Sequence, residues 1–143
     1  MLLRYGLIAA CLLGLGAAAQ AQDATQPQDS VVERKVKGQA GRDVRIGAYF
    51  NIKPDCTTGP LPTLRLKEPP ANGKVTVRQM RVQATNVRQC LAVEVPAFVA
   101  FYRSSPGFTG QDSALIEITS ASGKVHLHRI LLTVEKPTGG QEI

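Results

Sequence analysis

The chain has 143 residues, 43% of them hydrophobic, and carries 17 Lys and Arg against 11 Asp and Glu. One compact domain fits this length, and two domains of ordinary size do not. Beyond the N-terminal segment, no apolar stretch approaches the roughly 20 residues that a membrane-spanning helix needs. No transmembrane segment is therefore expected in the mature protein.

The N-terminal segment has the features of a secretory signal peptide. Arg4 precedes an apolar run over residues 7–19, and Ala19-Gln20-Ala21 supplies small residues for a cleavage site. Cleavage after Ala21 would leave 122 residues with 16 basic and 11 acidic side chains, a net charge of +5. Residues 1–21 therefore predict export to the periplasm, the cell surface or the medium.

One alternative for this segment is a lipid anchor. Ile8-Ala9-Ala10-Cys11 resembles the box that precedes a lipid-modified cysteine in bacterial lipoproteins. Only about six residues separate Arg4 from Cys11, fewer than the usual apolar core of about 7 to 15 residues. Because the apolar run also continues past Cys11, the pattern favours an ordinary signal peptide.

Polar segments border the expected domain on both sides. Residues 22–30 are polar and without periodicity, which predicts a disordered leader. Residues 137–143 contain a proline and two glycines and predict a flexible tail. The folded domain is expected over residues 31–136.

Cys56 and Cys90 are the two cysteines that remain after cleavage. An even number of cysteines in an exported protein predicts a disulfide. The bond would close a loop of about 35 residues and stabilise the fold by roughly 3 to 4 kcal/mol. A metal-thiolate pair or a redox pair is less favoured, because the sequence has neither Cys-x-x-Cys spacing nor further cysteine ligands.

Apolar and polar side chains alternate through most of the folded segment, which is typical of strands with one buried face. Over residues 44–52, the side chains predicted to face a core are Val44, Ile46, Ala48, Phe50 and Ile52, and those predicted to face solvent are Arg45, Gly47, Tyr49 and Asn51. Shorter alternations occupy residues 63–67, 74–78, 91–95 and 116–119. About seven short strands, separated by turn residues and without helical periodicity, predict an all-β antiparallel sandwich.

Residues 102–114 predict a structural corner that begins at Tyr102. Phe108 would fill the core from within a loop, and Gly110 would supply an unusual backbone angle. Asp112 would accept hydrogen bonds from nearby backbone amides. The predicted role of this segment is structural and not catalytic.

These residues resemble the cadherin-like, immunoglobulin-like domains that recur in tandem in large bacterial surface proteins and adhesins. The positions that match the repeat pattern are Pro70, Gly73, Val75, Tyr102, Phe108, Gly110, Asp112, Gly123 and Val134. The resemblance spans about residues 44–134 and implies an immunoglobulin-like sandwich, here as a single exported unit. Ser104 replaces the proline after the tyrosine, and Ala114 and Ile116 replace aromatic residues. Residues 119–122 lack the acidic side chains of those repeats, so neither calcium nor any other cofactor is implied.

His126 and His128 lie two residues apart on one predicted strand, with both side chains on the same face. Such a pair binds Zn or Cu when a neighbouring strand supplies a third ligand, for which Glu117 is the local candidate. The alternative is two exposed or half-buried strand residues near the Gly123 turn. We favour that alternative and predict no metal site.

Arg78, Arg81 and Arg88 are the candidate anion-binding residues, and they share one predicted strand and the loop before Cys90. Arginine suits two-pronged contacts with carboxylate or phosphate, and anions of the envelope are the partners available to an exported basic protein. An ordinary charged solvent face is the alternative. Export argues against nucleic acid as a partner.

No sequence motif indicates a nucleophilic serine, a pair of catalytic carboxylates or a phosphate-binding loop, so no enzyme activity is expected. The sequence predicts an exported, non-enzymatic module of the bacterial periplasm or cell surface that binds a protein or an anionic envelope component. The alternatives are a structural or accessory envelope protein without a specific ligand and, least favoured, a small metal-binding protein that uses His126 and His128.

Overall fold

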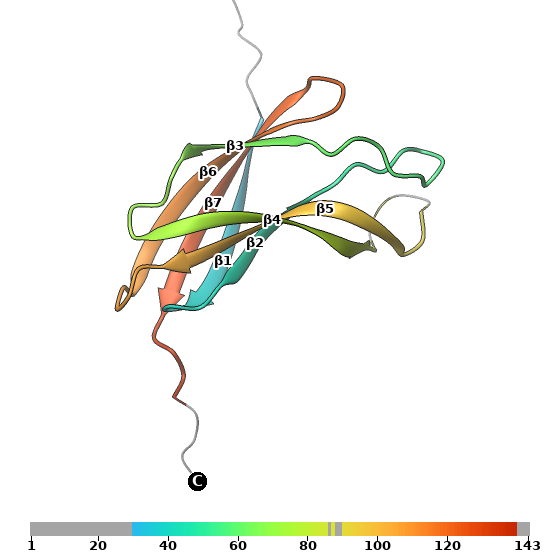
Figure 1. Cartoon of the computed structure of the whole chain (residues 1–143). Coiled ribbons are helices and arrows are strands. Elements are labelled where there is room, and N and C mark those ends of the chain that lie inside the picture. The colour runs from blue at the N-terminus through green and yellow to red at the C-terminus, as the bar shows by residue number, and fades with distance from the viewer. Residues whose placement is uncertain (1–29, 86, 88–89, 140–143) are drawn as a thin grey trace, which may run out of the picture.

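The computed structural model describes residues 30–85, 87 and 90–139, which form seven strands in two facing sheets (Figure 1). The strands are β1 (Val31–Gln39), β2 (Val44–Tyr49), β3 (Thr63–Glu68), β4 (Gly73–Ala84), β5 (Val93–Ser104), β6 (Gly110–Thr119) and β7 (Val125–Glu135). The predicted signal peptide, Arg88 and most of the predicted leader and tail lie outside the described residues. Among the residues that are described, none belongs to a helix that could cross a membrane.

The two sheets have the strand orders β1-β7-β6-β3 and β2-β5-β4. This arrangement, with no helix in the described residues, confirms the predicted immunoglobulin-like sandwich. One pairing differs from the expected antiparallel arrangement, because β1 runs parallel to β7 from Val31 opposite Leu127 to Gln39 opposite Glu135. The first and last strands can pair in this way because the other strands, which lie between them in the chain, supply the long connection that parallel pairing needs.

The hydrophobic core lies between the two sheets and draws on both. Its buried members are Ile46, Tyr49, Ala100, Tyr102, Ile116, Ile118, Ile130, Leu132 and Val134. On β6 and β7 these residues are spaced by two, as the alternating pattern predicts for strands with one buried face. The alternation over residues 116–119 therefore identified the correct core side chains.

Residues 44–52 depart from their predicted alternation because of a β-bulge. The register of β2 against β5 shifts between Arg45 and Gly47. An extra residue in one strand turns the following side chains to the opposite face. Tyr49, predicted to face solvent, is consequently buried in the core at 7% exposure, and Gly47 is buried beneath its ring. The strand also ends at Tyr49, before the predicted end at residue 52.

Strands β4 and β5 also differ from their predicted lengths. They pair antiparallel over twelve residues each, from Gly73 opposite Ser104 to Ala84 opposite Val93. Leu91, predicted to alternate with Val93 and Val95 on one strand face, precedes β5 and is 88% exposed. Because β5 pairs with it along its whole length, β4 is longer than the five residues, 74–78, over which apolar and polar side chains clearly alternate.

Residues 102–114, the segment predicted as a corner, join β5 to β6 and keep the turn before β4 in place. One Asp112 carboxylate oxygen accepts backbone hydrogen bonds from Ala71 and Ser113, and the other accepts one from Asn72. The buried Tyr102 hydroxyl donates to the same carboxylate at 2.8 Å. Asp112 therefore ties the end of β5 and the start of β6 to the turn over residues 69–72.

The remaining corner residues fill the space around these hydrogen bonds. Phe108 packs against the core from the loop, and Gly110 has φ of 127°, a backbone angle that favours glycine. The Tyr102 ring lies so close to Gly73 that a Cβ there would come within 2.4 Å of a ring carbon. Glycine at residue 73 thus lets the turn approach the tyrosine.

The predicted disulfide between Cys56 and Cys90 is confirmed. It joins the connection between β2 and β3 to the connection between β4 and β5, with 34 residues separating the two cysteines in the chain. Both connections lie outside the core cluster. No strand pairing joins the described residues of these two connections, so the disulfide links them covalently.

Candidate anion-binding site

The outer face of the β2-β5-β4 sheet, which points away from the other sheet, carries several basic side chains. On β4, Lys74, Thr76 and Arg78 alternate with Val75, which packs against the core, so these three side chains share the outer face. The register with β5 places Arg103 beside Lys74. Two neighbouring strands therefore bring Lys74, Arg78 and Arg103 to one region.

These side chains border a half-open pocket of about 410 Å³. The pocket is lined by Asp43, Gly73, Lys74, Thr76, Arg78, Arg103, Ser104, Ser105 and Pro106. Its charged members are three cations and one carboxylate. Because like charges in one concavity reinforce each other's potential, the pocket favours an anionic ligand.

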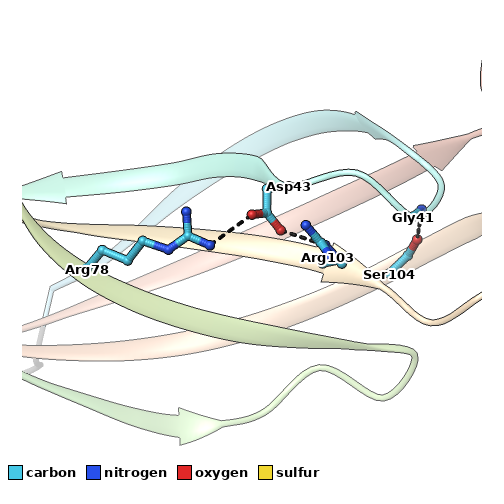
Figure 2. Close-up of polar contacts among 5 residues, drawn as sticks. All are labelled: Gly41, Asp43, Arg78, Arg103 and Ser104. Carbon is cyan, nitrogen blue, oxygen red and sulfur yellow. Dashed lines mark hydrogen bonds and ion pairs between the residues drawn. The ribbon is translucent and has the colours of Figure 1, made fainter.

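Asp43 lies between the two arginines and contacts both (Figure 2). The Arg103 Nε–H donates to Oδ1 at 2.7 Å, and the Arg78 Nη2–H donates to Oδ2 at 3.1 Å. The hydrogen bond from Arg103 is the main cause that holds the pKa of Asp43 below its usual range, and Arg78 adds to this effect. The carboxylate thus remains charged and holds the guanidinium groups near each other.

Asp43 leaves most of the donor capacity of the two arginines unused. Each guanidinium group carries five N–H donors and spends one on the carboxylate. The side chains of Arg78 and Arg103 are 58% and 59% exposed. Lys74 makes no ion pair with any described residue. Donors in the fork geometry that suits carboxylate and phosphate therefore face the pocket and the solvent.

Two further contacts fix the positions of these groups. The Arg78 guanidinium carbon lies 5.0 Å from the centre of the Phe101 ring, a cation–π contact that restrains the long side chain. The Gly41 backbone N–H donates to the buried Ser104 hydroxyl at 3.0 Å, which holds the turn before Asp43 against the end of β5 (Figure 2). A hydrogen bond therefore fixes the turn before Asp43, and an aromatic contact restrains Arg78.

Of the three predicted arginines, the structure describes Arg78 and Arg81 and places them apart. Arg78 lies in the pocket, whereas Arg81, three residues farther along β4, points to the opposite face of the strand. Arg81 donates through Nε to Glu94 at 2.7 Å. Arg88 lies outside the described residues. The site is therefore built around Arg78 and includes Lys74, Arg103 and Asp43, which the sequence reasoning missed.

The predicted histidine pair lies on the core-facing side of β7. The register places His128 opposite Ile116 and His126 opposite Ile118, two core residues. Glu117, the expected third ligand, has the opposite orientation on β6 and pairs with Lys67 at 3.2 Å. In residues 30–85, 87 and 90–139, no three His, Cys, Asp or Glu side chains gather in a group that could hold a metal ion.

His128 instead belongs to a partly buried polar group at the edge between the sheets. Its ring centre lies 5.7 Å from that of Tyr49, and the Arg34 Nη1–H reaches across from β1 to the Ile46 carbonyl at 3.2 Å. Burial is the main cause that lowers the pKa of His128, and the positive charges of Arg34 and His126 add to it. Burial also raises the pKa of Tyr49, whose hydroxyl has no hydrogen-bond partner among the described residues.

We expect the stability of the protein to fall on acidification from about pH 7.5 to about pH 5, in part because of His128. In the unfolded chain this imidazole takes up its proton near its usual pKa of 6.5, before the folded form does. The unfolded state therefore binds more protons in this window and gains stability as the pH falls. Over the same pH window, acidification should lower the Tm of His128→Gln by less than it lowers the Tm of the wild type. An equal decrease in both proteins would contradict this assignment.

Comparison of the chain with protein-family models, curated proteins and solved structures finds no match. The function therefore has to be inferred from the chemistry of the site.

Proposed function

We propose that the protein is an exported, non-enzymatic immunoglobulin-like module of the bacterial periplasm or cell surface. Its outer sheet face would bind carboxylate or phosphate groups of an envelope component. The observation that carries this proposal is the pocket lined by Lys74, Arg78 and Arg103, in which the single carboxylate, that of Asp43, contacts the two arginines. We name this pocket, with these four charged residues, the basic pocket.

Two other features support the proposal. The N-terminal 21 residues have the pattern of a secretory signal. A disulfide such as Cys56–Cys90 is characteristic of proteins that work in oxidising compartments. Outside the cytosol, the abundant anions are lipid headgroups, glycans and acidic proteins, so a basic pocket has partners of complementary charge there.

Titration of the purified protein with a short polyglutamate peptide and with inorganic polyphosphate tests the proposal. We expect saturable binding that weakens as salt is added, because the contacts are charged and partly exposed. The double variant Arg78→Gln/Arg103→Gln should bind about tenfold more weakly, since charge-assisted hydrogen bonds are lost. Asp43→Asn should bind more tightly than the wild type, because it removes the negative charge from the pocket and keeps a side-chain oxygen that can accept a hydrogen bond from an arginine.

A matched control separates the basic pocket from net charge alone. Arg65→Gln/Arg129→Gln also removes two positive charges, but both residues lie on the other sheet, on β3 and β7. This variant should retain most of the binding. Equal weakening by both double variants, or the absence of saturable binding, would contradict the proposal and favour a structural envelope protein whose charged surface only maintains solubility.

A further inference from the structure

The free edge of β4 is a long, regular row of backbone groups. β4 spans twelve residues and pairs with β5 in unbroken register along its whole length. On its other side, no described strand pairs with it, because β4 is the last strand in the order β2-β5-β4. Unpaired N–H and C=O groups along such an edge are a template for an added strand.

Proteins usually protect a long edge strand by shortening it or by interrupting it with a bulge or a proline. β4 has no bulge against β5, and its sequence, Gly-Lys-Val-Thr-Val-Arg-Gln-Met-Arg-Val-Gln-Ala, contains no proline. Its protection comes from positive charge, at Lys74, Arg78 and Arg81. Charge of one sign prevents pairing with like strands and permits pairing with a strand of opposite charge.

An apolar groove runs beside this edge. β3 and β4 are the edge strands of the two sheets and are joined by the short connection over residues 69–72, so both border the same side of the sandwich (Figure 1). Between them lies a groove of about 460 Å³, lined by Leu61, Pro62, Thr63, Leu64, Val77 and Phe98. Val77 is 48% exposed there. An apolar partner side chain that covered it would gain hydrophobic free energy.

The two faces of β4 determine what an added strand would need. Side chains of the added strand that lie beside Val75 and Val77 would point toward the groove. Those that lie beside Lys74, Thr76 and Arg78 would point toward the basic pocket. Because side chains alternate along a strand, the matching sequence alternates apolar residues with acidic ones. A second copy of β4 would instead bring the same three cations, Lys74, Arg78 and Arg81, to the new edge, where like charges repel.

We propose that the free edge of β4 binds an extended acidic segment of a partner protein, in which apolar and acidic residues alternate. This inference rests on the proposed function, since it specifies the chemistry of the partner that the basic pocket recognises. Backbone hydrogen bonds to β4 would supply affinity, and the groove and the cations would supply specificity.

The probe is a capped peptide of about eight residues in which Val and Glu alternate, long enough to cover most of the free edge. We expect it to bind the purified protein at least about tenfold more tightly than a peptide of the same composition with the Val and Glu residues in separate blocks. Hydrogen exchange should slow at alternate amides of β4, the ones that point away from β5. Protection in this pattern is specific for strand addition.

Peptide chemistry provides a control that leaves the protein unchanged. N-methylation of alternate amides along one edge of the peptide removes the hydrogen bonds of that edge and keeps every side chain. Methylation of the edge that faces β4 should abolish binding, and methylation of the other edge should leave it intact. Strand addition is wrong if both methylated peptides bind as tightly as the parent peptide. It is also wrong if both bind more weakly than the parent.

Two protein variants test the groove with the same substitution, which keeps the shape of the side chain and replaces a methyl group by a hydroxyl. Val77→Thr should weaken peptide binding several-fold, whereas Val31→Thr, at a residue of similar exposure on β1, should leave it unchanged. Dimerisation of the free protein through β4, seen by sedimentation and by the same amide protection without peptide, would overturn the inference in favour of a second copy as the occupant.

Failure of this inference is distinguishable from failure of the proposed function. One outcome is that the polyglutamate peptide binds through Arg78 and Arg103 while the β4 amides exchange at their free rate in the presence of the alternating peptide. In that case the basic pocket functions without strand addition. If the alternating peptide binds equally well to Arg78→Gln/Arg103→Gln and to the wild type, the proposed role of the basic pocket is wrong.

Discussion

Asp112→Ala is expected to destabilise the domain by about 3 kcal/mol or more, because it removes several charge-assisted hydrogen bonds at once. The carboxylate accepts backbone hydrogen bonds from Ala71, Asn72 and Ser113 and another from the Tyr102 hydroxyl. With alanine, the Tyr102 hydroxyl at the end of a buried side chain loses its closest partner. Urea unfolding followed by circular dichroism measures the change in the free energy of unfolding.

Two further variants separate the parts of this network. Tyr102→Phe removes only the contacts of the hydroxyl with Asp112 and with the Asn72 carbonyl and keeps the ring in the core, so it should cost only about 1 kcal/mol. Asp112→Asn keeps an acceptor oxygen and should be intermediate in stability. If Asp112→Ala is no less stable than Tyr102→Phe, the backbone hydrogen bonds of the turn contribute little, and the proposed structural role of Asp112 is wrong.

Removal of the disulfide by Cys56→Ala/Cys90→Ala should lower the free energy of unfolding by about 3 to 4 kcal/mol, because the unfolded chain regains the entropy of an open loop. The expected size follows from the 34 residues that separate the cysteines. Hydrogen exchange in the folded variant should quicken in the connections between β2 and β3 and between β4 and β5. The strands around the core should remain protected.

Reduction of the wild type provides the control for the cysteine substitutions. Reduced wild-type protein and the double alanine variant should have the same midpoint of denaturation, since both lack the cross-link. If the variant is as stable as the oxidised wild type, the entropy of the loop does not contribute to stability in this protein.

The fold class could be predicted because alternation of apolar and polar residues follows directly from strand geometry. Ile116 and Ile118 alternate as expected and lie in the core. The bulge in β2 could not be predicted in the same way. It depends on the pairing of Arg45 and Gly47 with a strand more than 50 residues farther along the chain, so Tyr49 was assigned to the wrong face.

The candidate site was predicted only in part for a related reason. Alternation already placed Lys74 and Arg78 on one face of a strand, whereas the grouping of Arg78 with Arg81 and Arg88 followed closeness in sequence. Asp43 is 35 residues from Arg78 and 60 from Arg103. Contacts over such separations arise from strand order, which local patterns do not determine.

The proposed function requires that Arg78 and Arg103 together bind an anionic group at the basic pocket. The most direct measurement is an NMR titration of the arginine Nε–H signals with inorganic phosphate. We expect the signals of Arg78 and Arg103 to shift together and saturate at one midpoint, with a lower midpoint in Asp43→Asn. Small, unsaturated shifts of equal size at Arg78, Arg103, Arg65 and Arg129 would contradict it.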